Sequence, residues 1–199
     1  MSTADTKLTK TPYKKEKFTE EQLLDLARCA EDPKFFMINY CWIQHPTKGR
    51  VKFDLFDYQK ELVDCYHKNR YSIALVSRQM GKSTAAAGYL LWYAIFKGEQ
   101  VVGVLANKNA IAREMLARIT LMLENLPFFL QPGCTALNKG SIGFSNNSRI
   151  IAAATSSSSI RGMSLNLVYL DEFAFVDNAA EFYTSTYPVI SSGKTSKII

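Results

Sequence analysis

From Tyr71 to the end of the chain, short apolar runs alternate with longer segments of helical spacing, and this alternation constrains the fold more than any other feature. The apolar runs are short enough to be buried strands and lie at 72–76, 101–106, 149–154 and 167–170. Residues 82–97 and 109–125 predict helices, and a weaker β region around 138–140 predicts a hairpin. Such alternation predicts an α/β, three-layer fold with a mostly parallel central sheet.

The residues before the α/β region divide into two parts. Residues 1–18 are polar and rich in lysine, so they predict a flexible basic arm and contain no apolar stretch typical of a secretory signal. Residues 19–56 predict a small helical lead-in region, and residues 57–199 the core domain. The free cysteines described below are typical of a reducing cytosol.

The expected helices of the lead-in region have recognisable start signals. Thr19 is followed by Gln22 at the third helical position, the pattern of a capping box. An Asp-Pro pair at 32–33 favours the start of a second short helix, because proline is tolerated in a first turn. The stretch 45–54 contains a proline and a glycine and is interpreted as a connection to a third helix at 57–69.

Composition excludes several classes of protein. A hydrophobic fraction of 47% with 21% charged residues is typical of a soluble globular domain, and the net charge of +6 permits a nucleic-acid partner without requiring one. The four cysteines form no CxxC pair and have no zinc-site spacing with the two histidines, so free thiols are predicted. The uncharged run 83–96 is shorter than the roughly 20 residues of a membrane span, so we expect a buried helix and no membrane partner.

The segment 77–84 lies between a predicted strand and a predicted helix. A loop that opens into a helix directs backbone N–H groups at one point, where the helix dipole also favours negative charge. Gly81 permits close approach of a phosphate, Lys82 can reach the β and γ phosphates, and the Ser83 hydroxyl can ligate Mg²⁺. The predicted nucleotide-binding residues of this loop are Ser77, Arg78, Gln79, Met80, Gly81, Lys82, Ser83 and Thr84.

This loop departs from the usual phosphate-loop pattern at one position, because Val76 stands where the first glycine is expected. An ordinary helix N-terminus is the alternative interpretation, and the flanking strand and helix favour phosphate binding over it. A second Gly-Lys-Thr at 193–195 has Pro188 at its first-glycine position and no helix after it, so we reject that copy.

The predicted strand at 167–170 ends in two carboxylates, Asp171 and Glu172. Ligand sites of parallel sheets lie at the carboxyl ends of the strands, which places this pair beside the phosphate loop. Asp171 is predicted to hold Mg²⁺ or its waters, and Glu172 to orient and deprotonate an attacking water. The alternative is a solvated acidic pair that opens the next loop.

Two arginines and one aromatic-amide pair complete the candidate site. Arg78 lies inside the phosphate loop, and Arg161 precedes the acidic strand; either can neutralise charge that develops on the γ-phosphate, and an ordinary surface arginine is the alternative for each. Tyr58 is a candidate for stacking on adenine, and the Gln59 amide for reading the edge of the base. An aromatic residue on a helix more commonly belongs to the core.

Together these residues resemble the ATPase domain of the large terminase subunit of tailed bacteriophages, a member of the P-loop NTPases. The resemblance covers about residues 50–199, and its motifs are 77–84, 168–175, 57–59 and 160–162. Ser-Arg-Gln-x-Gly-Lys is a terminase form of the phosphate loop, so the absent first glycine is expected in that family.

The resemblance implies ATP hydrolysis with Mg²⁺, coupled to movement of double-stranded DNA into the procapsid. It also implies that Tyr58 and Gln59 contact adenine and that Arg78 senses charge. The implied partners are double-stranded DNA, the portal protein, the small terminase subunit and further copies in a ring. The implied location is the host cytoplasm, transiently at the procapsid portal.

Two elements of the family are not found in this sequence. A threonine-rich coupling segment follows a strand like the one that begins at 197–199, and the metal-dependent nuclease domain follows later; both are expected to be missing. A parallel sheet buried on both faces has an unpaired apolar edge if its last strand is cut short, so we expect the isolated chain to be poorly stable. Two alternative functions stay open. One is a helicase-like DNA-remodelling ATPase, and the other is a truncated remnant that binds nucleotide without turnover.

Overall fold

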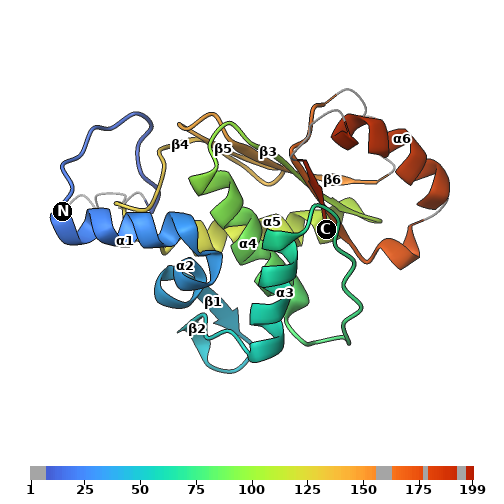
Figure 1. The fold of residues 1–199 in the computed structure, drawn as a ribbon, viewed down its shortest axis with the longest axis horizontal. Helices are drawn as coiled ribbons and strands as arrows, with labels where there is room; N and C mark the ends of the chain where they lie inside the picture. The colour runs from blue at the N-terminus through green and yellow to red at the C-terminus, as the bar shows by residue number, and fades with distance from the viewer. Residues whose placement is uncertain (1–7, 156–162, 177–178, 192–195) are drawn as a thin grey trace, which may run out of the picture.

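The computed structural model describes residues 8–155, 163–176, 179–191 and 196–199, and every statement about the structure refers to these residues (Figure 1). The helices are α1 (Glu20–Glu31), α2 (Pro33–Tyr40), α3 (Asp57–Lys68), α4 (Lys82–Phe96), α5 (Asn109–Glu124) and α6 (Ala179–Ser191), with a 3₁₀ turn at Phe173–Phe175. The strands are β1 (Trp42–His45), β2 (Gly49–Lys52), β3 (Val101–Ala106), β4 (Cys134–Leu137), β5 (Ser141–Phe144), β6 (Arg149–Ala154), β7 (Leu167–Asp171) and β8 (Lys197–Ile198).

The larger sheet has the strand order β4-β5-β6-β3-β7-β8. Strands β6, β3, β7 and β8 are mutually parallel, whereas the β4–β5 hairpin adds an antiparallel edge, so the predicted mostly parallel sheet is confirmed. The register places Ala106 of β3 opposite Asp171 of β7. The carboxyl ends of β3 and β7 therefore lie at the same edge of the sheet, where a ligand site is expected.

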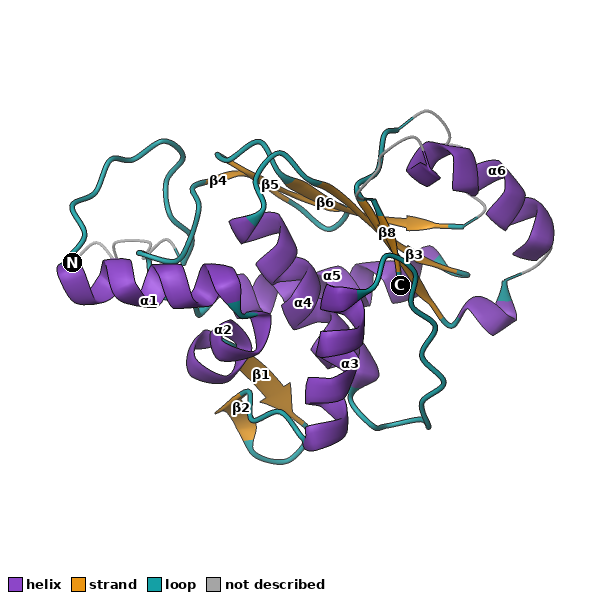
Figure 2. Ribbon diagram, viewed as in Figure 1, coloured by secondary structure: helices purple, strands orange, loops and turns teal. Residues whose placement is uncertain are grey.

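Helices cover both faces of this sheet (Figure 2). Helices α4 and α5 pack on one face around a large apolar core, and a smaller cluster that includes Leu105 and Val168 contacts Phe182 of α6 on the other. Residues 85–94 of α4 are all buried, which confirms the helix buried on most sides. Within the described ranges, no helix is both apolar and long enough to span a membrane.

The N-terminal region combines confirmed helix starts with one correction. Thr19 Oγ1 accepts from the Gln22 N–H while the Gln22 amide oxygen accepts from the Thr19 N–H, the predicted capping box. The interpretation of 45–54 as a plain connection is wrong, because β1 and β2 form an antiparallel hairpin there. Gly49 adopts φ +71°, which allows the chain to reverse within a short turn.

The predicted strand at 72–76 is not formed, and this is the largest correction to the fold. Only Tyr71 bridges to Ile198 of β8, and beyond it Ile73 and Leu75 are fully exposed, at 99% and 102%. A strand needs a neighbour to satisfy its backbone groups. The Ser72 N–H still donates to the Ile198 carbonyl, but β8 ends at Ile198, so residues 73–76 have no strand beside them in the described structure. An apolar run alone does not supply that neighbour.

The second half of the expected basic arm is held against the domain. The Lys10 N–H donates to Gln131 Oε1 at 2.9 Å, and the Cys134 N–H donates to the Lys10 carbonyl at 2.9 Å. Lys10 Nζ also lies 3.1 Å from a Glu16 carboxylate oxygen. Residues 8–16 are thus attached to the segment before β4, whereas residues 1–7 lie outside the described structure.

Gly133→Ala is expected to release this attached arm. A β-carbon at Gly133 would lie 2.5 Å from Pro12 Cα and 2.8 Å from the Thr11 carbonyl oxygen, and backbone atoms cannot yield without moving the arm. Tryptic cleavage within the arm should accelerate roughly tenfold, because overpacking of this size costs about 1–3 kcal/mol. Gly140→Ala is the control, since its nearest neighbour would be 3.6 Å away. Equal cleavage rates for the two variants would refute the prediction.

Candidate nucleotide site

The loop before α4 has the backbone geometry of an anion site. Helix α4 begins at Lys82, and the residue before it, Gly81, is left-handed with φ +70° and provides no side-chain cap. Gln79 is also left-handed, with φ +64°, in a region that non-glycine residues adopt rarely. Turns of this kind direct successive N–H groups to one side, and the uncapped first turn of the helix adds its own donors.

The structure brings Lys82 and Asp171 together. Lys82 Nζ lies 3.5 Å from Asp171 Oδ1, although the two residues come from the start of α4 and the end of β7. The Asp171 side chain is buried, while that of Lys82 is 31% exposed, so solvent reaches the pair from the lysine side. The lysine of the loop and the first carboxylate after the strand thus lie side by side at one edge of the sheet.

Tyr169 is a site residue that the sequence analysis missed. Its hydroxyl donates to Asp171 Oδ1 at 3.3 Å, and it also interacts with the Ser83 hydroxyl. Burial, and to a smaller extent the negative charge of Asp171, raises the pKa of the Tyr169 phenol, so this group stays protonated and remains a donor. The available signal was the strand period of two, which puts Tyr169 and Asp171 on the same face.

Glu172 follows β7 in a strained conformation. Its φ of +52° lies in the left-handed region, which costs on the order of 1–3 kcal/mol for a non-glycine residue and is common at functional sites. This turn takes Glu172 out of the extended ladder that positions Asp171. Asp171 is therefore the last residue of the ladder, and Glu172 lies in the turn that follows it.

Tyr58 and Gln59 brace the phosphate loop in this structure. The Tyr58 hydroxyl and the Gln59 amide nitrogen both donate to the Met80 carbonyl, at 2.7 and 3.2 Å. The Gln59 amide oxygen accepts from the Phe56 N–H at 3.1 Å, and the side chain is buried. The amide groups proposed to read adenine are thus already engaged within the protein, which gives Gln59 a structural task beside the predicted one.

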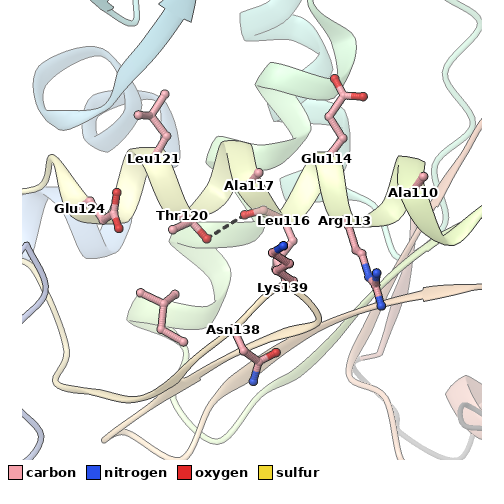
Figure 3. A pocket seen from close by; sticks show the side chains of 11 residues that line it. Ala110, Arg113, Glu114, Leu116, Ala117, Thr120, Leu121, Glu124, Asn138 and Lys139 are labelled. Carbon is pink, nitrogen blue, oxygen red and sulfur yellow. Dashed lines mark hydrogen bonds between the residues drawn. The ribbon is translucent and has the colours of Figure 1, made fainter.

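Two cavities lie near these elements. One of about 430 Å³ is lined by Tyr58, Leu62, residues 73–77 and Met80, so it adjoins the phosphate loop. The other, of about 600 Å³, lies between α5 and the β4–β5 turn and contains none of the predicted site residues (Figure 3). The smaller cavity is therefore the candidate for a nucleotide base.

The structure shows no hydrogen bond or ion pair between the remaining predicted residues and the Lys82–Asp171 pair within the described part of the chain. Arg78 is exposed in the loop, and Arg161 lies outside the described residues. Thr84 accepts from Arg118 Nη1 of α5 at 3.3 Å, a contact that sequence spacing did not indicate.

The candidate ligands for a metal ion at this site are oxygen atoms. The part of the chain that the structure describes contains no group of three or more His, Cys, Asp or Glu side chains able to hold a metal. Ser83 and Asp171 supply a hydroxyl and a carboxylate, joined through Tyr169. This set fits Mg²⁺, which proteins commonly hold through one or two such ligands together with substrate phosphates and water.

A parallel sheet with an acidic strand tip beside an uncapped Gly-Lys helix start defines a P-loop-type α/β nucleotide-binding domain. Comparison with known families narrows this class. The family described as terminase large subunit, T4likevirus-type, N-terminal, matches residues 73–199, and the chain belongs to that family.

Solved structures agree with the fold. The large terminase of bacteriophage HK97 matches with a TM-score of 0.71 and 18% identity, over 85% of this chain and 36% of that one. The large terminase ATPase domain of Thermus phage P74-26 matches with a TM-score of 0.64 and 18% identity, over 84% of this chain and 68% of that one. This chain thus spans about a third of the HK97 protein, and the likeness establishes the α/β fold.

Proposed function

We propose that this chain is the motor domain of a phage terminase, which hydrolyses ATP to move double-stranded DNA into the procapsid. The observation that carries the proposal is the 3.5 Å approach of Lys82 to Asp171 at the phosphate loop, within a chain of the terminase family. The similar folds of the HK97 large terminase and of the P74-26 large terminase ATPase domain support it.

In this proposal each group at the sheet edge has one task. Backbone N–H groups around Gly81 and the Lys82 ammonium bind the β and γ phosphates. Ser83 and Asp171 would hold Mg²⁺, which neutralises phosphate charge when bound. Glu172 orients a water molecule for attack on the γ-phosphorus and accepts its proton.

The two arginines and the residues around the base are assigned further roles in this proposal. Arg78, on the open side of the loop, is proposed to stabilise charge on the γ-phosphate from within the chain, and Arg161 to do so from a neighbouring copy. The base is proposed to lie in the 430 Å³ cavity against Tyr58, while Gln59 supports the loop. Double-stranded DNA, the portal protein, the small terminase subunit and a homo-oligomeric ring are the proposed partners, in the host cytoplasm.

Steady-state ATP turnover with and without DNA tests the proposal. We expect slow turnover that double-stranded DNA stimulates severalfold, without separation of the strands of a forked duplex. Strand separation would favour the helicase-like alternative. Nucleotide binding with no turnover under either condition would favour the truncated remnant and contradict the motor assignment for this chain.

A further inference from the structure

Helix α3 ends against β8, where one lysine side chain bonds several carbonyl groups. Lys197 Nζ donates to three backbone oxygens, those of Tyr66 (3.0 Å), His67 (3.0 Å) and Asn69 (2.6 Å). The last carbonyls of a helix have no partner within it, and positive charge is favoured there by the helix dipole. All three N–H donors of the ammonium are therefore used on one helix end.

The opposite end of the same helix holds the phosphate loop. Tyr58 and Gln59 lie in the first turn of α3, and both donate to the carbonyl oxygen of Met80. Helix α3 has 12 residues, so it spans about 18 Å at a rise of roughly 1.5 Å per residue. One rigid element thus connects the loop at 77–81 to strand β8.

Strand β8 is linked in turn to the sheet edge that carries Asp171. Ile198 pairs with Val168 of β7, and β7 ends in Asp171, whose carboxylate lies 3.5 Å from Lys82 Nζ. The Ser72 N–H donates to the Ile198 carbonyl at 2.9 Å, so the chain that leaves α3 is also attached to β8. Contacts therefore run from the loop to α3, from α3 to β8, from β8 to β7, and from β7 back to the helix start at the loop.

We propose that Lys197 is a positioning residue for nucleotide binding. Its ammonium fixes the axial position of α3 against β8, and α3 in turn holds the Met80 carbonyl, so the phosphate loop keeps the shape that binds phosphate. The inference rests on the proposed assignment of residues 77–84 as the phosphate loop. A lysine that only capped α3 would alter the stability of the fold and leave nucleotide affinity unchanged.

A double-mutant cycle between the two ends of α3 tests this coupling. Tyr58→Phe removes one donor to Met80, and Lys197→Met removes the ammonium but keeps the length of the side chain. Each single change is expected to weaken the binding of a fluorescent ADP analogue with Mg²⁺ about three- to tenfold. The double variant should be weakened no more than the more affected single variant, because either change alone already frees the loop.

The matched control is Lys68→Met, which removes a lysine charge at the same end of α3. Lys68 is mostly exposed and pairs with Asp64 at 3.8 Å, so this variant should bind nucleotide like the original protein. Should Lys197→Met not fold, Lys197→Arg serves the same cycle, because a planar guanidinium cannot place its donors on all three carbonyls.

Multiplicative effects of Tyr58→Phe and Lys197→Met would overturn the inference, as would a lowered thermal midpoint for Lys197→Met with unchanged affinity. Lys82→Ala separates this failure from failure of the proposed function. If neither the original protein nor any variant binds the analogue, the phosphate-loop assignment is wrong. If the original protein binds it, Lys82→Ala does not, and Lys197→Met binds normally, only the role of Lys197 is wrong.

Discussion

Replacing Glu172 by glutamine is expected to lower kcat for ATP hydrolysis about 10²- to 10⁴-fold, the usual contribution of a positioned general base. The amide keeps the shape of the side chain but cannot accept a proton from water. Nucleotide affinity should change by less than about twofold, because the proposed contacts with phosphate come from the loop and Lys82 and not from Glu172. Single-turnover hydrolysis and equilibrium binding, measured on the same preparation, separate the two quantities.

Glu99→Gln is the matched control for this substitution. Glu99 is also a glutamate with positive φ, at +53°, but it lies in the turn before β3, at the opposite end of that strand from Asp171. Any effect of the Glu-to-Gln change on a left-handed backbone is therefore present in both variants. Equal turnover by Glu172→Gln and Glu99→Gln would remove Glu172 from the mechanism, whereas loss of nucleotide binding in Glu172→Gln would assign it to the phosphate contacts instead.

Sequence periodicity predicted the elements that pack against one another in the central core. Strands β3, β6 and β7 and helices α4 and α5 were predicted within a residue or so at each end, because their apolar faces meet one another in a single core. The segment 72–76 has the same apolar character and was predicted wrongly. Pairing is a property of two segments, and periodicity reports on one of them.

The site shows the same division between local and non-local information. The helix start at Lys82 and the acidic end of β7 are local signals, and the parallel topology alone brings them together. The bonds of Tyr58 and Gln59 to Met80 join residues about twenty positions apart, and those of Lys197 to α3 join residues more than a hundred apart. Neither set has a spacing that a sequence pattern can reveal, so the support of the loop became visible only in the structure.

Replacing Lys82 by alanine is expected to raise the Kd for ATP about 30- to 1000-fold and to abolish turnover at millimolar ATP. Loss of a partly desolvated charge contact with phosphate has this size. The change also deprives the buried Asp171 carboxylate of its nearest cation, so the free energy of unfolding should fall in the absence of nucleotide. Isothermal titration with ATP and thermal unfolding of the apo protein measure the two effects.

A second substitution distinguishes lost phosphate contact from lost folding. In the double variant Lys82→Ala with Asp171→Asn, the unpaired buried charge is gone, so thermal stability should recover while nucleotide binding stays absent. Lys108→Ala provides the control, since Lys108 precedes α5 at the same sheet edge but is exposed and outside the phosphate loop. If nucleotide affinity recovered together with stability in the double variant, Lys82 would be a structural partner of Asp171 and the phosphate would bind elsewhere.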